Sequence, residues 1–219
     1  MAKLVIGTNK TVGVPAVVKV VQITPVEPYP LLSRVKDDSN NEIGTVSGYH
    51  TDANNQKYAV VCLDAQYRLA SGQIFQEIGV AVTDLTSAMD NSVWENTDTA
   101  TSNCDKIIAF ANAQSYTSSG LSHCRNQSFV IDGVTYYGQL PTVSELQNIY
   151  LNRTQINTKD TSASQYSSLV IPLRSPGSWS STQANANSFW YKTSDGGVSY
   201  NIRRDYLMII PVLEIPINE

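Results

Sequence analysis

Alternating apolar and polar positions predict short β-strands, and three pairs of these strands form predicted hairpins. Each pair is separated by residues that favour tight turns, among them Asp132-Gly133 and Asp195-Gly196-Gly197. The paired runs are residues 44–51 with 57–63, 129–131 with 134–136, and 188–193 with 198–203. Residues 206–215 are rich in Ile and Val without alternation, which predicts a buried last strand.

Two segments have helical periodicity instead. Residues 97–114 carry apolar side chains at helical spacing, namely Ala100, Cys104, Ile107, Ile108 and Ala111. A second helix is expected from Thr142 to about Arg153, because Thr142 and Glu145 have the spacing of a capping box. Residues 157–168 read as a polar loop. Helices and strands that follow one another in this way predict an α+β fold.

The first thirty residues differ from the rest and predict an extended, β-rich N-terminal arm over residues 1–30. β-branched valines dominate it, and prolines that cannot donate to a β-ladder interrupt them. Such a segment cannot bury its valines alone, so the expected partner is another protein or another copy of this chain. The expected attachment residues are Val5, Val12, Val14, Val17 and Val18. A disordered N-terminus is the alternative.

Composition excludes several classes of partner. Charged residues make up 16% of the 219 residues, the net charge is −4, and Lys and Arg do not cluster, so no nucleic acid partner is expected. No run approaches the ~18 apolar residues of a membrane span, and no secretory leader is recognisable. Hydroxyl and amide side chains are abundant instead, with twelve Tyr, which is typical of adaptable recognition surfaces. A Tyr-rich β-protein without a ligand is the alternative.

Candidate catalytic chemistry is sparse. The two histidines are His50 and His123, and a dyad of His123 with Cys124 lacks an orienting third group. No sequence motif for a metal, a phosphate or a nucleophilic serine occurs. We therefore expect no enzyme, no catalytic residues, no metal and no cofactor. The three cysteines are expected to be free thiols, with a Cys104–Cys124 bridge as the alternative.

Two motifs in a fixed order carry a family resemblance. Gly138-Gln139-Leu140-Pro141-Thr142-Val143-Ser144-Glu145-Leu146 is followed by Ser178-Trp179-Ser180-Ser181-Thr182, by the third hairpin and by a final Pro-Val-Leu-Glu. Over residues 58–219 this order resembles the C-type-lectin-like modules of bacterial surface proteins and phage fibre proteins. The opening MAKLVIGTNKTVGVPAVVKV resembles the starts of structural proteins in phages of gut Bacteroidetes, the crAss-like phages.

The resemblance implies a C-type-lectin-like domain, with a twisted antiparallel sheet and two helices, over residues 58–219. Residues 31–57 would be a linker with the first strands. The chain departs from calcium-dependent lectins, because Pro172-Leu173-Arg174-Ser175-Pro176 stands where those carry Glu-Pro-Asn or Gln-Pro-Asp. It also lacks the cysteine pair of the related formylglycine-generating enzymes. A recognition surface without calcium is what remains.

The expected function is that of a bacteriophage structural protein: a head fibre, a tail fibre or a capsid decoration. It would assemble in the host cytoplasm, join the virion through its arm and adhere to a host surface glycan or protein. A homotrimer is expected, with a dimer as the alternative. A bacterial adhesin is the main rival function, and a formylglycine-generating type of enzyme is a third.

The expected ligand-binding residues lie on and around the third hairpin. Phe189 and Tyr191 are expected to point into the core, although Trp190 is an alternative core residue. Trp179 is expected to be structural. The ligand-binding residues are Asn185, Asn187, Trp190, Lys192, Tyr200, Arg203, Arg204 and Tyr206.

Overall fold

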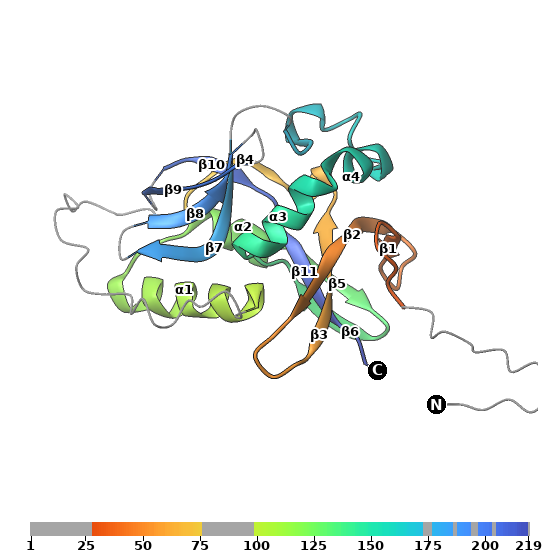
Figure 1. The fold of residues 1–219 in the computed structure, drawn as a ribbon, viewed down its shortest axis with the longest axis horizontal. Coiled ribbons are helices and arrows are strands. Elements are labelled where there is room, and N and C mark those ends of the chain that lie inside the picture. The colour runs from red at the N-terminus through yellow and green to blue at the C-terminus, as the bar shows by residue number, and fades with distance from the viewer. Residues whose placement is uncertain are drawn as a thin grey trace, which may run out of the picture.

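The computed structural model describes residues 28–75, 99–172, 177–185, 188–193, 197–202 and 205–218. Apart from residues 28–30, the predicted arm lies outside the described residues. The five valines that are expected to attach the arm to a partner also lie outside them. Within the described part the fold is α+β, as the sequence predicts, with antiparallel sheets and four α-helices (Figure 1).

The first sheet joins the start of the described chain to its end. Its strands, in spatial order, are β1 (Arg34–Lys36), β2 (Glu42–Thr51), β3 (Lys57–Leu63) and β11 (Val212–Pro216), all antiparallel. The predicted hairpin of residues 44–51 and 57–63 is confirmed as β2–β3. Residues 31–57 therefore contribute two strands to the sheet that β3 and β11 complete.

A small hairpin covers one face of this sheet. Strands β5 (Ser128–Ile131) and β6 (Val134–Tyr137) pair around Asp132 and Gly133, which both have positive φ, as the Asp-Gly dipeptide predicts. The N–H of Asp38 donates to the Val130 carbonyl at 2.8 Å, and Gln139 forms a β-bridge with Val212. Inward residues of the hairpin and of the sheet share one apolar cluster, which includes Val61, Phe129 and Leu213.

The second sheet has five strands. In spatial order they are β4 (Leu69–Gly72), β10 (Leu207–Ile209), β7 (Ser178–Asn185), β8 (Ser188–Lys192) and β9 (Val198–Ile202). The β8–β9 hairpin confirms the third predicted pair, with Trp190 opposite Tyr200. Strands β7 and β10 run parallel, and the other neighbours are antiparallel.

The predicted single last strand over residues 206–215 is wrong. The chain forms β10 in the second sheet, passes Ile210 and Pro211, and then forms β11 in the first sheet. Pro211 has no N–H for a ladder, while its carbonyl accepts from the N–H of Leu63 at 3.0 Å. Because the strand is interrupted at the proline, one apolar segment contributes a strand to each of the two sheets.

The helices are α1 (Ala100–Gln114), α2 (Ser119–Arg125), α3 (Val143–Leu151) and α4 (Arg153–Lys159). Helices α1 and α3 confirm the two predicted helices. The polar loop predicted over residues 157–168 is partly wrong, because its first residues complete α4 and residues Ser167–Leu169 form a 3₁₀ turn. A second 3₁₀ turn covers Ala65–Tyr67. Cys62, Cys104 and Cys124 are buried free thiols, as expected, and no Cys104–Cys124 bridge forms.

Helix α3 lies between the two sheets and contacts β2 on one side and β7 and β8 on the other (Figure 1). Gly48 in β2 permits the close approach, because a Cβ there would lie 2.8 Å from the Asn148 amide nitrogen. On the other side of β3, Val60 and Cys62 share a buried cluster with Leu146 and Ile149 of α3. Strand β3 is therefore covered on both faces.

Two buried glutamates hold the N-termini of α1 and α3. Glu214 of β11 accepts hydrogen bonds from the Ala100 N–H at 2.7 Å, the Thr101 N–H at 2.9 Å and the Thr101 hydroxyl at 2.6 Å. Glu145 completes the predicted capping box by accepting from the Thr142 N–H at 2.7 Å. Burial, followed by the charge of Glu214 and a hydrogen bond with it, raises the pKa of Glu145 well above its ordinary value. The raised pKa favours the protonated form of Glu145 in the folded protein.

The raised pKa predicts that stability falls as pH rises. The folded state keeps a proton on Glu145 that the unfolded chain releases above about pH 4.3, so the free energy of unfolding declines from there upward until the folded pKa is passed. E145Q supplies a permanent donor of the same shape and should flatten this decline. Urea unfolding at several values between about pH 5 and pH 8 measures the slope.

Asp105→Asn is the control for this experiment, because Asp105 is an exposed carboxylate paired with Arg125 on the surface. This variant should keep the slope of the parent protein. An E145Q slope equal to that of the parent would show that Glu145 is not protonated in the folded protein.

Candidate functional site

The two sequence motifs meet in space. The N–H of Ser181 donates to the Pro141 carbonyl at 2.7 Å, and the N–H of Val143 donates to the Thr182 hydroxyl at 2.9 Å. The Tyr150 and Ser178 hydroxyls hydrogen-bond at 2.9 Å at the other end of α3. Strand β7 is thus fixed against α3 over the full length of the Trp-Ser-Ser-Thr motif, which sets where β8 and β9 lie relative to the helix.

The buried side chain of Trp179 fixes strand β7 to the neighbouring chain segments. It has no exposed surface, and its indole N–H lies 3.1 Å from the carbonyl oxygens of both Gly72 and Asp205. The Tyr191 ring packs against it edge-on, with the ring centroids 6.0 Å apart. The structural role expected for Trp179 is confirmed, because a buried, hydrogen-bonded indole cannot reach a ligand.

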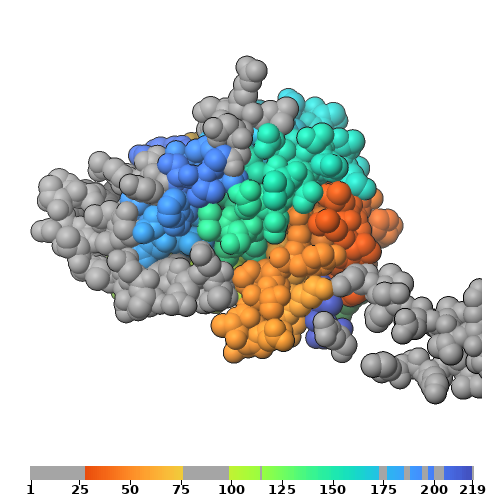
Figure 2. Space-filling model, in the orientation of Figure 1, coloured from red at the N-terminus to blue at the C-terminus, as the bar shows by residue number. Residues whose placement is uncertain are grey.

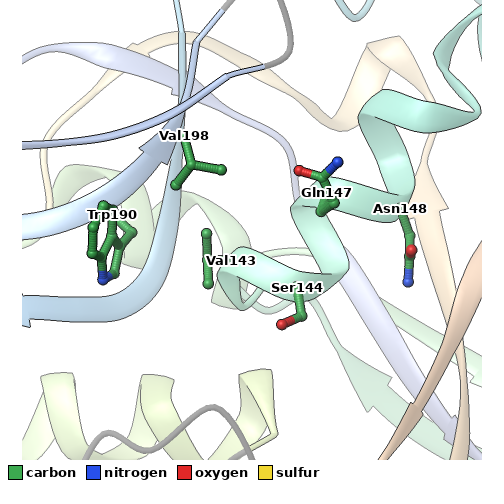
Figure 3. Close-up of a pocket in the computed structure, with 6 residues that line it drawn as sticks. All are labelled: Val143, Ser144, Gln147, Asn148, Trp190 and Val198. Carbon is green, nitrogen blue, oxygen red and sulfur yellow. The ribbon is translucent and has the colours of Figure 1, made fainter.

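A hollow of about 510 Å³ opens between α3 and the β8–β9 hairpin (Figure 3), and we call it the α3–β8 hollow. Figure 2 shows α3 as a band between the strands of the two sheets on this face of the molecule. Six residues line the hollow: Val143, Ser144, Gln147 and Asn148 from α3, and Trp190 and Val198 from the hairpin.

The lining combines one aromatic ring with uncharged polar groups. Trp190 is half-buried, Val198 is 46% exposed, and Ser144 is exposed at the start of α3. None of the six carries a charge. An indole that offers a ring for stacking, next to amides and a hydroxyl that donate and accept, is suited to polar rings that have both apolar faces and hydroxyl edges.

Lys192 lies beneath the hollow and not on the outer surface. Only 1% of it is exposed, and its ammonium group donates to the Gln147 side-chain oxygen. The expectation of an exposed contact at Lys192 therefore needs correction: α3 packs over this end of β8 and covers the side chain. The bond also fixes the Gln147 amide, because its oxygen is engaged and its NH₂ group is the one that can donate to a ligand.

The structure places the other residues of the predicted hairpin site in four different ways. Phe189 is fully buried and Tyr191 packs against the core, as expected, while Trp190 lines the hollow. Tyr206 is 61% exposed and lies outside the lining. For Asn185 and Tyr200 the structure describes the backbone alone, at the end of β7 and opposite Trp190. Asn187, Arg203 and Arg204 lie outside the described residues.

Sequence reasoning missed the helical wall of the hollow. Ser144, Gln147 and Asn148 are polar and lie on one side of the capped helix, at positions i, i+3 and i+4. That pattern was visible in the sequence, but it is also the pattern of any solvated helix face. Only the contact of α3 with β7 and β8 brings it opposite Trp190.

The alternative nucleophile is not supported by its surroundings. The His123 ring nitrogen Nε2 lies 2.8 Å from the Tyr67 carbonyl, and burial raises the pKa of the Cys124 thiol well above its ordinary value. Within the described ranges, no three His, Cys, Asp or Glu side chains gather where they could hold a metal ion. None of the helices in those ranges is long and apolar enough to span a membrane.

No protein-family model, no curated protein and no solved structure matches this chain. The α3–β8 hollow is therefore interpreted from its own geometry and from the motifs that build it.

Truncation of two neighbouring aromatic residues on β8 should lower stability to different extents. Phe189→Ala removes a fully buried ring and should lower the free energy of unfolding by about 3–5 kcal/mol. Trp190→Ala, on the face toward the hollow, should cost roughly half of that or less. Denaturant unfolding of both variants measures the difference. Equal losses would place Trp190 in the core and remove it from the candidate site.

Proposed function

We propose that this chain is a structural virion protein of a bacteriophage, a head fibre, tail fibre or capsid decoration, that displays a C-type-lectin-like domain for adhesion to the host surface. The observation that carries the proposal is the contact between the two motifs. Pro141 and Thr142 begin α3, Ser181 and Thr182 hydrogen-bond to that beginning, and the hairpin that follows supplies Trp190. The residues that resemble phage fibre modules are thus the residues that build the hollow.

The chemistry of the lining favours a neutral sugar as the ligand. A pyranose ring can stack an apolar face on Trp190 while its hydroxyls exchange hydrogen bonds with Ser144, Gln147 and Asn148. The lining residues that the structure describes offer no charged side chain to a strongly acidic ligand, and the Lys192 ammonium is already bonded to Gln147. The hairpin residues predicted from sequence, such as Asn187 and Arg204, stay predictions for a wider contact surface.

Binding should depend on the hollow more than on the surrounding surface. Trp190→Ala should weaken attachment to host cells by about 2 kcal/mol or more, which is roughly a 30-fold loss, because the stacking platform disappears. Gln147→Ala should weaken it less. A glycan array followed by calorimetry on the best neutral glycan measures the loss.

Leu151→Ala is the matched control, since Leu151 is 68% exposed at the far end of the same helix. Its attachment should equal that of the parent protein. Undiminished attachment by Trp190→Ala, with an unchanged unfolding curve, would remove the hollow as the receptor site. Tyr206→Ala then tests the exit of the hairpin as the next candidate.

Incorporation into phage particles separates the virion role from that of a cellular adhesin with the same domain. A chain that lacks residues 1–27 keeps all the described strands and helices, so it should still bind glycan. It should no longer join particles, because the valine-rich segment is the expected attachment element. Particle purification followed by immunoblotting measures this, and normal incorporation of the truncated chain would contradict the assigned role of the arm.

A further inference from the structure

The described chain begins beside the turn of the β5–β6 hairpin and is fixed there. The Tyr29 hydroxyl donates to the Asp132 carboxylate at 3.0 Å, and the Tyr49 hydroxyl donates to the Tyr29 carbonyl at 2.9 Å. The Asp38 carboxylate binds the same turn, because it accepts hydrogen bonds from the N–H groups of Asp132 at 2.8 Å and Gly133 at 3.0 Å. Residues 1–27 therefore leave the domain next to this hairpin.

Two exposed apolar side chains, Val130 and Tyr137, lie on the outer side of this hairpin. Within the described ranges seven large apolar side chains are exposed, and four of these lie on the hairpin or close to Tyr29 in the chain: Leu31 at 49%, Val130 at 43%, Val134 at 51% and Tyr137 at 50%. Strands β5 and β6 alternate, with Phe129 and Ile131 turned inward and Val130 and Tyr137 turned outward. The register pairs Val134 with the inward residue Ile131, so we call the outward side, which carries Val130 and Tyr137, the hairpin face.

We propose that the hairpin face is the docking site for the valine-rich N-terminal arm of a neighbouring copy of this chain. The arm offers what the face lacks, namely a run of β-branched side chains, from Val12 to Val21, that have no cover within their own segment. β-branched and aromatic side chains on adjacent extended segments pack well against each other. The root of the arm is already anchored at this hairpin, so copies arranged about a symmetry axis bring arms and faces close together.

The sequence of the root favours exchange with a neighbour over folding back. Pro25, Pro28 and Pro30 keep the chain extended, and residues 16–30 contain no Gly, Asn or Asp that would favour a reversal. Eight residues separate Tyr29 from Val21, which is about 26 Å of extended chain. A four-residue strand of the hairpin is only about 13 Å long. In an extended arm the valines would thus lie beyond their own hairpin and within reach of a neighbouring copy.

An arm-on-face exchange can be reciprocal in a two-fold dimer, or it can run head to tail around a ring of three or more copies. Head-to-tail contacts close into rings when the rotation between copies permits it. The expected homotrimer is the smallest such ring with more than two copies. This inference concerns assembly and does not depend on the hollow, so it can fail while the proposed glycan binding stands.

Photo-crosslinking of the full chain tests the contact directly. With Tyr137→p-benzoylphenylalanine, irradiation should produce a covalent species of twice 24.0 kDa on a denaturing gel. Mass spectrometry should identify the peptide that contains position 137 joined to one from residues 11–24. Linkage within a single 24.0 kDa chain, or to a peptide outside the arm, would overturn the proposal.

A second experiment asks whether the face holds the assembly together. Val130→Thr and Tyr137→Thr combined in the full chain keep residues suited to strands while removing apolar surface from the hairpin face. By light scattering, the mass of this variant should fall from the assembled value to 24.0 kDa, with an unchanged circular dichroism spectrum.

Val198→Thr is the matched control, because Val198 is a strand valine of similar exposure, 46%, on the other sheet. It should keep the assembled mass. An unchanged mass in the double variant, or a parent chain of 24.0 kDa at all concentrations, would overturn the proposal.

Discussion

Two buried carboxyl groups at the start of two helices fix the centre of this protein. Glu214 lies on the last strand and accepts hydrogen bonds from the N-terminus of α1, while Glu145 caps α3, and burial together with the charge of Glu214 raises the pKa of Glu145. Removing either carboxyl group would leave buried helix N–H groups without an acceptor. Because α1 packs on β7 and α3 contacts β2, β7 and β8, the positions of both sheets depend on this pair.

The second constraint is the passage of the chain from one sheet to the other at Pro211. Strand β10 lies between β4 and β7, and β11 lies beside β3, so a run of ten residues belongs to two sheets. Glu214 lies on β11, which pairs with β3 along one side. Gln139, which pairs with Val212 on the other side, also begins the segment that leads into α3. The last strand, the buried pair and the cap of α3 form one connected unit.

The shape of the candidate site depends on this connected unit. Its helical wall is held by the Thr142 cap and by Thr182, and its hairpin wall is held by the pairing of β7 with β8. The lining residues lie on rigid elements and are uncharged, which suits recognition of a polar ring. The hairpin face lies on the first sheet, on elements that do not line the hollow, so assembly and binding have separate surfaces.

The sequence by itself determined the local elements, because their signals are local. Thr142 and Glu145 predict a helix start, Asp132-Gly133 predicts a hairpin, and alternation predicts β2, β3 and β8. It could not show that residues 206–215 divide between two sheets, that Lys192 is covered, or that Gln147 faces Trp190. Those facts depend on which elements pack together, and polar helix faces and apolar runs look the same in sequence whatever they contact. Tertiary structure alone brought the cap of one helix, a buried carboxyl pair and a distant hairpin into one site.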